Sequence, residues 1–164
     1  MPLQAAVAAL VVLILAGAAV VASFGQSNTF LVAGLTLDHV KCFALSGGAD
    51  AADADPRVVE ASLQRDYGWR VRVPRGAPRE RLRLVGARRC LSSDGSVAHL
   101  LYRHHGKAIS LFVLPSSVRE TTSASIAGYP ARVWSRGGST FVLVGSESEA
   151  SMRPVARYFE GASY

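Results

Sequence analysis

The sequence contains none of the short motifs that mark the common classes of enzyme. Gly-x-Ser-x-Gly, His-Glu-x-x-His and a glycine-rich phosphate loop with its Lys are all absent from the 164 residues. Zinc-finger and helix-turn-helix patterns are missing too, as is Cys-x-x-Cys-His, the attachment signal of c-type haem. We therefore expect a protein that is not an enzyme, that carries no cofactor and that does not bind nucleic acid.

Positive charge is missing from the start of the chain, because the first basic residue is Lys41. The formal net charge is nevertheless +6, and ten Arg stand against three acids between Arg57 and Arg89. Arg side chains bind carboxylates and phosphates through their planar fork. This stretch is therefore a candidate surface for lipid headgroups or an acidic protein partner, and a solvated basic face is the alternative.

Charged and strongly polar residues are also missing between Ala5 and Ala22. Eighteen apolar residues in a helix reach about 27 Å, close to the ~30 Å of a bilayer core. We expect residues 1–25 to be a transmembrane anchor. A cleaved signal peptide is the alternative, although the run lacks the usual basic start. Ala16 and Gly17 are candidate contacts with a membrane partner, since small residues let helices approach closely in lipid.

Residues 26–164 are expected to form one α+β domain with an antiparallel sheet. Helical spacing and capping residues predict helices over 30–45, 56–67 and 147–159, with Asp55 and Ser146 as N-caps. Residues 46–55 read as a loop. Alternation and turn residues predict strands over 69–73, 82–90, 97–103, 108–114, 129–135 and 139–145.

The chain has only two cysteines, Cys42 and Cys90. An even pair in a domain outside the cytoplasm favours a disulfide, which would stabilise the domain by about 4 kcal/mol. A metal site is the alternative. His39 and Cys42 lie three apart on one side of a helix, and His99 follows Cys90. Two thiolates with imidazoles suit zinc or copper, but this spacing is not diagnostic.

Several short segments then occur in a particular order. They are Asp38-His39-Val40-Lys41-Cys42-Phe43, Arg89-Cys90-Leu91, Asp94-Gly95, Ala98-His99-Leu100 and Tyr102-Arg103-x-x-Gly106-x-x-x-Ser110-Leu111. Over roughly residues 35–114 the chain resembles the extracytoplasmic domain of bacterial transmembrane anti-sigma factors. The resemblance implies a domain outside the cytoplasm in which both cysteines, His39 and His99 form a redox- or metal-responsive site. The cytosolic zinc segment of that family, His-x-x-x-Cys-x-x-Cys, is absent, so we expect no binding of a sigma factor by this chain alone.

Together these features favour a non-catalytic, single-span protein of the bacterial cytoplasmic membrane, with its C-terminal domain in the periplasm. We expect it to be an accessory subunit of a larger membrane complex, with respiratory or photosynthetic electron transfer as one setting. Arg70, Arg72, Trp69 and Trp134 are the candidate interface residues of the domain, because aromatic and Arg side chains are common at interfaces. Packing in the core is the alternative for the tryptophans. The alternative function is a sensor of oxidant or metal, like the anti-sigma domain.

Overall fold

The computed structural model describes residues 2–25, 27–45, 54–77, 81–92, 94–115 and 117–162, with the backbone alone at 2–5, 19, 21–25 and 45. Its helices are α1 (Pro2–Gly25), α2 (Asn28–Leu45), α3 (Pro56–Tyr67) and α4 (Glu149–Gly161). Its strands are β1 (Gly76–Ala77), β2 (Leu82–Ser92), β3 (Gly95–His104), β4 (Lys107–Leu114), β5 (Thr122–Ile126), β6 (Tyr129–Arg136) and β7 (Ser139–Gly145).

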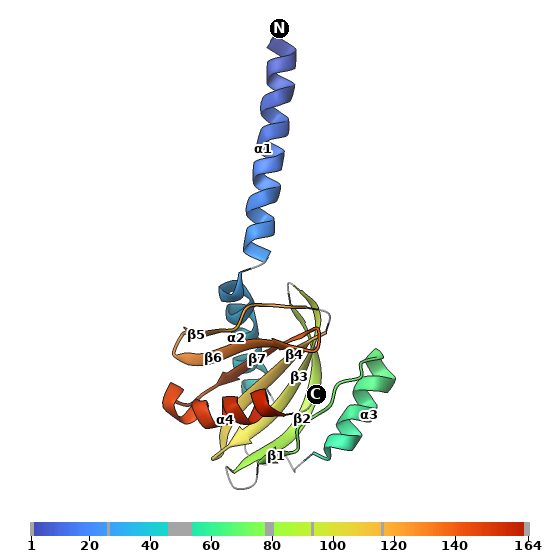
Figure 1. The fold of residues 1–164 in the computed structure, drawn as a ribbon, viewed down its shortest axis with the longest axis vertical. Helices are drawn as coiled ribbons and strands as arrows, with labels where there is room; N and C mark the ends of the chain where they lie inside the picture. Colours follow the sequence, from blue (N-terminus) through green and yellow to red (C-terminus); the bar gives the residue numbers. More distant parts are fainter. Residues whose placement is uncertain are drawn as a thin grey trace.

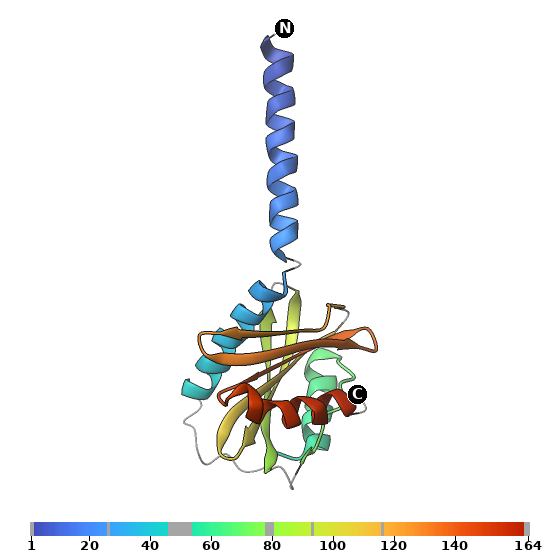
Figure 2. The same cartoon turned by 60° about the vertical axis from the view of Figure 1, so that its left-hand side comes forward.

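The strands form one curled antiparallel sheet in the order β1-β2-β3-β4-β7-β6-β5. Helix α2 packs on one face of this sheet, and α3 and α4 pack on the other (Figures 1 and 2). Each face has its own apolar core, so the domain has three layers. The predicted α+β class with an antiparallel sheet is confirmed.

Strand β4 shows how one sheet supplies both cores. Side chains alternate between the faces of a strand. Accordingly Ile109, Leu111 and Val113 join the core under α3 and α4, whereas Phe112 and Leu114 join the core under α2. Ser110 belongs to the second set, and it is fully buried. A polar side chain in this position must find hydrogen-bond partners inside the core.

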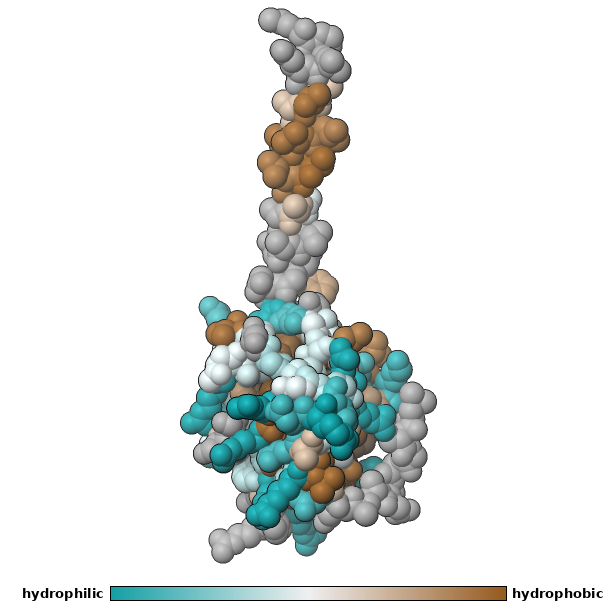
Figure 3. Space-filling model, turned by 90° about the vertical axis from the view of Figure 1, so that its right-hand side faces the viewer, coloured by the Kyte–Doolittle hydropathy of each residue, from teal (hydrophilic) through white to brown (hydrophobic). Residues whose placement is uncertain are grey.

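Helix α1 projects away from the layered domain (Figure 1). Its described apolar side chains are exposed, for example Leu13 at 69% and Leu15 at 64%, and its middle is strongly hydrophobic in Figure 3. Among the residues that the structure describes, no helix combines the length and the apolar character that a membrane crossing requires.

The predicted strand over 69–73 is wrong, because this segment is not a strand and pairs with none of the strands in the described part of the chain. The alternation of apolar and polar residues reflects burial without strand pairing, because Val71 and Val73 pack against the core under α3 and α4. The backbone N–H of Val73 donates to the Glu60 carboxylate at 2.7 Å, which satisfies the group without a ladder. Strand β5 was not predicted, since its sequence Thr-Ser-Ala-Ser-Ile carries little hydrophobic signal.

The helix ends agree in part with the predictions. Asp55 caps α3 by accepting a hydrogen bond from the Arg57 N–H at 2.8 Å, as predicted. Helix α4 begins later than predicted and is capped by Ser148 rather than Ser146. Pro154 lies inside α4 without ending it. The predicted loop over 46–55 lies outside the described residues, apart from residues 54 and 55.

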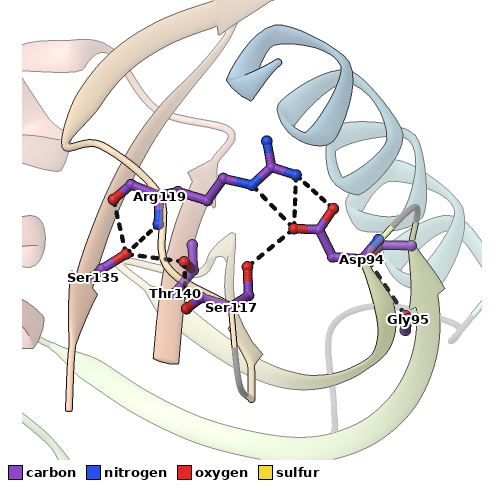
Figure 4. A network of polar contacts seen from close by, with 7 residues as sticks. Asp94, Gly95, Ser117, Arg119, Ser135 and Thr140 are labelled. Atoms are coloured by element: carbon purple, nitrogen blue, oxygen red, sulfur yellow. Dashed lines mark hydrogen bonds and ion pairs between the residues drawn. The ribbon is translucent and has the colours of Figure 1, made fainter. Parts of the chain in front are cut away.

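A buried ion pair locks the β2–β3 hairpin to the far half of the sheet (Figure 4). The Arg119 guanidinium donates to both carboxylate oxygens of Asp94, at 2.6 Å and 2.8 Å. Ser117 donates to the same carboxylate at 3.0 Å, and Ser135 accepts from the Arg119 backbone N–H at 2.7 Å. Charged groups that are buried need such partners, and here they connect the β2–β3 turn to the segment between β4 and β5.

Candidate functional site

An irregularity in β2 decides which way Cys90 points. The pairing of β2 with β3 shifts register between Leu84 and Gly86, which is the mark of a β-bulge. Before the shift Leu84 pairs with Tyr102 under α3 and α4, and after it Cys90 pairs with Val97 under α2. Without the extra residue, Cys90 would share the face of Leu84. Gly86 likewise lies on the face opposite to Leu82 and Leu84, although simple alternation along the predicted strand over 82–90 would place all three on one face.

Helix α2 supplies the other half of the site. Leu31 and Leu35 bury its inner face, and His39, one turn further, is only 1% exposed. Cys42 follows three residues later and so lies on the same side of the helix. The sulfur atoms of Cys42 and Cys90 and a ring nitrogen of His99 all lie within 4.8 Å of one another. Three elements, α2, β2 and β3, therefore meet at one cluster.

A chain of hydrogen bonds runs from this cluster through the core. The Sγ of Cys90 lies 3.5 Å from Nδ1 of His99, whose Nε2 lies 2.6 Å from Ser110 Oγ. Ser110 Oγ also lies 2.7 Å from Nδ1 of His39, and Nε2 of His39 lies 3.1 Å from Ser146 Oγ. Every group in the chain has one donor and at least one acceptor, so all the bonds form when they point in one direction.

Burial sets the protonation of these groups. It lowers the pKa of His39 to about 4, and it lowers that of His99 to about 3, with the charges of His39 and Arg88 adding to the effect on His99. Both imidazoles are therefore neutral at pH 7. Burial also raises the pKa of the Cys90 thiol to about 12, and the Asp38 carboxylate contributes in the same direction. Such a thiol is a slow nucleophile until its proton is displaced.

The cluster opens to solvent at a hollow beside the two cysteines. The hollow there has a volume of ≈ 570 Å³, and it is lined by Asp38, Lys41, Cys42, Arg88, Arg89, Cys90 and Leu91. His99 is fully buried behind the two cysteines, which are themselves half-buried. A small ion can therefore reach the sulfur atoms from this hollow, whereas a larger substrate cannot reach Ser110.

All four residues of the alternative metal set, His39, Cys42, Cys90 and His99, come together, although only the last three offer ligand atoms to one point. Both cysteines are thiols in this structure. Their proximity leaves the predicted disulfide as a prediction for a redox titration. Two thiols and an imidazole can do either of two things chemically: form a disulfide or bind a soft metal ion.

The other candidate residues lie apart from this cluster. Arg70 and Arg72 are exposed on the irregular segment after α3, and Trp69 is half-buried there. Trp134 is 5% exposed and stacks on Phe141, so it is a core residue, which was the alternative interpretation. Ala16 is exposed on α1, and the Cα of Gly17 faces open space.

Two members of the hydrogen-bonded chain were missed by reasoning from the sequence. Ser110 looked like an ordinary sheet serine, and Ser146 was assigned to a helix cap. The available signal was the position of Ser110 between Ile109 and Leu111 in a strand that is apolar from Ala108 onward apart from this serine. A buried polar residue in such a strand requires partners, but only the fold shows that they are His39 and His99.

No protein-family model, no curated protein and no solved structure matches this chain.

Proposed function

We propose that this chain is a non-catalytic sensor domain, tethered to the bacterial cytoplasmic membrane with its domain in the periplasm, that responds to thiophilic metals or oxidants at Cys42 and Cys90. One observation carries the proposal: three elements distant in sequence bring both thiols and His99 within 4.8 Å of one another. This is the function implied by the resemblance to extracytoplasmic anti-sigma domains.

The position of α2 supports a sensor rather than a purely structural pair. Helix α1 ends at Gly25 and α2 begins at Asn28, so only two residues separate them. The same α2 carries Cys42 near its other end. In the thiol form α2 is held on the sheet by Leu31, Val32 and Leu35. A bond between Cys42 and the sheet would add a second restraint, at the other end of the helix that leads directly to α1.

The tether is supported by the character of α1. The helix has 24 residues, and it extends away from the domain with its described apolar side chains exposed. Exposed apolar surface of this extent is costly in water, at about 25 cal/mol per Å². Extraction of membranes with alkaline carbonate tests the tether: the chain should stay in the pellet, and its release into the supernatant would contradict an anchor.

The burial of Ser110 supports a function without catalysis. The hydroxyl lies between two imidazoles, as a nucleophile would, but Ser110 and His99 are 0% exposed and His39 is 1% exposed. A substrate bond cannot approach a hydroxyl that is enclosed in this way. The histidines and the serine therefore serve to hold the cluster.

Thiol alkylation followed by mass spectrometry of the intact chain tests the sensor function. We expect both cysteines to react in the reduced, metal-free protein and both to be protected together after mild oxidation or metal addition. Hydrogen exchange in residues 28–45 should slow in the protected state, because α2 is then tied to the sheet. Alkylation of Cys42 and Cys90 that neither oxidation nor metal addition reduces would contradict the proposal.

A second candidate, the accessory subunit of a membrane complex, is favoured by a different observation. The outer face of α2 exposes Phe30 at 56%, Leu37 at 68% and Val40 at 38%, next to the exposed α1. Arg70 and Arg72 add a basic surface for headgroups or an acidic partner. Purification in mild detergent tests this function: partners should elute with the chain and be lost in Gly17→Leu, whereas elution as a lone monomer would contradict it.

A further inference from the structure

We propose that Cys42, Cys90 and Nδ1 of His99 together bind one thiophilic d10 cation, with Zn²⁺ as the best match. This inference rests on the proposed function, because it names the ligand of the same site. It goes further in one respect: the resting, reduced form of the sensor is a metal complex rather than a pair of thiols. Binding forms two S–Zn bonds and one N–Zn bond and releases the two thiol protons to solvent.

The distances between the ligand atoms fit the ion. In tetrahedral sites Zn–S is about 2.3 Å and Zn–N about 2.0 Å, which places a sulfur and a nitrogen ligand about 3.5 Å apart. Cys90 Sγ and His99 Nδ1 lie 3.5 Å apart. Two sulfur ligands of the same ion lie about 3.8 Å apart, and Cys42 Sγ is within 4.8 Å of both other atoms. The site thus needs only a small movement of the Cys42 side chain.

The hydrogen-bonded chain prepares His99 for this role. A metal-binding imidazole usually donates its other N–H to an oxygen, which fixes both the tautomer and the orientation of the ring. Here Nε2 of His99 lies 2.6 Å from Ser110 Oγ. When Nε2–H donates to Ser110, the lone pair of Nδ1 points at Cys90, Ser110 donates to His39, and His39 donates to Ser146. Stacking on Phe112, with centroids 4.1 Å apart, holds the ring plane.

Charge favours a divalent ion over a monovalent one. Two thiolates and a neutral imidazole carry a charge of −2, which Zn²⁺ cancels and Cu⁺ cancels only by half. Neutral sites are preferred in partly buried surroundings. The fourth position of a tetrahedral ion faces the hollow, where Asp38 is the carboxylate among the lining residues. Either water or Asp38 can complete the coordination.

The reduced full-length chain in mild detergent, freed of metal by a chelator, provides the test. Zn²⁺ is titrated in competition with a chromophoric chelator. We expect one ion per chain, with affinity lowered at least about 100-fold in Cys42→Ser, Cys90→Ser and His99→Gln. His105→Gln is the matched control, because His105 is an exposed histidine at the turn that follows β3. Its affinity should equal that of the unaltered protein.

A spectroscopic measurement keeps the proposal falsifiable if a variant fails to fold. Co²⁺ in place of Zn²⁺ in the unaltered protein should show the visible bands of a tetrahedral ion and the ultraviolet charge-transfer bands of two thiolates. A spectrum without thiolate bands, or Zn²⁺ affinity that the three substitutions leave unchanged, would overturn the site. Tight binding of Cu⁺ without binding of Zn²⁺ would overturn the choice of ion.

These results are separable from the proposed function. If the reduced chain binds neither Zn²⁺ nor Co²⁺ but Cys42 and Cys90 oxidise reversibly to a disulfide that slows exchange in α2, this inference fails and the sensor function stands. If the thiols neither bind metal nor oxidise together, both fail.

Discussion

The two faces of the sheet differ in what they bury. The face under α3 and α4 packs apolar side chains such as Leu63, Leu143 and Phe159. The face under α2 packs an apolar cluster of similar kind, but it also holds His39, His99 and Ser110 beside two thiols. Burying polar groups costs free energy unless each has a partner. The face under α3 and α4 also buries a polar pair, His104 Nδ1 and Glu147 Oε1 at 2.6 Å. The two faces therefore differ in the thiols and in the serine between two imidazoles, which lie on the face under α2.

The largest loss of stability should follow from a cavity in the core under α3 and α4. Phe159 is fully buried, with its ring 5.0 Å from that of Tyr102. Phe159→Ala should lower the free energy of unfolding by about 4 kcal/mol, because it opens a cavity, and should leave Zn²⁺ affinity unchanged. Urea denaturation of the full chain in detergent, followed by tryptophan fluorescence, measures the first quantity.

The matched variant on the other face is Val32→Ala, since Val32, on the inner side of α2, is also fully buried. It should cost less stability, about 2 kcal/mol, yet weaken Zn²⁺ binding because it loosens the helix that carries Cys42. Equal affinity in both variants would mean that the two faces are not functionally distinct.

Removing the ion pair at the β2–β3 hairpin should also lower the stability of the fold, by less than Phe159→Ala does. Arg119→Met leaves Asp94 as a buried carboxylate without its guanidinium, so we expect a loss of about 3 kcal/mol in the free energy of unfolding. Arg157→Met, at an exposed Arg on α4, is the control and should change stability by less than about 0.5 kcal/mol. A loss at Arg119 no larger than in the control would show that the network does not hold the hairpin.

Acid should destabilise the face under α2 selectively. The pKa of His39 is near 6.5 when unfolded and about 4 when buried. Between these values the unfolded chain takes up a proton that the folded chain refuses, so stability falls as pH falls from about 6.5 to 4. We expect this contribution to be about 3 kcal/mol, and His39→Gln should flatten the slope in a pH series of urea melts. An unchanged slope would contradict neutral burial of His39.

The smallest effect concerns the support of His99. Ser110→Ala removes the partner of its Nε2, and we expect Zn²⁺ affinity to fall about tenfold. Ser92→Ala, at a half-buried serine of the β2–β3 hairpin that is not part of the hydrogen-bonded chain, should leave the affinity unchanged. Nitrogen NMR of the His99 ring separates positioning from general damage: the Zn²⁺ form should be protonated at Nε2, and loss of this single tautomer in Ser110→Ala would mark a positioning role.

Most elements of the fold were predictable because they obey local rules. The strands over 97–103, 108–114 and 139–145 alternate or are continuously apolar, and α3 has both its Asp55 cap and a Gly68 end. The segment over 69–73 misled, since its alternation reflects packing without strand pairing. Strand β5 was not predicted, because an edge strand of small polar residues shows no distinctive pattern of hydrophobicity.

The sequence allowed us to name the residues of the candidate site, but not to predict how they come together. His39 and Cys42 share a helix face by their spacing, but nothing local connects them to Cys90 and His99. That connection depends on the β-bulge between Leu84 and Gly86, which turns Cys90 to the face of α2. A bulge is a property of the pairing of two strands, so one strand read alone does not reveal it.

The most direct test of a metal centre on the α2 face is the zinc X-ray absorption spectrum of the full-length, reduced chain. It should show two sulfur ligands at about 2.3 Å and an imidazole nitrogen at about 2.0 Å, with one sulfur lost in Cys42→Ser. A coordination shell of nitrogen and oxygen alone would contradict the assignment of Cys42, Cys90 and His99 as the ligands.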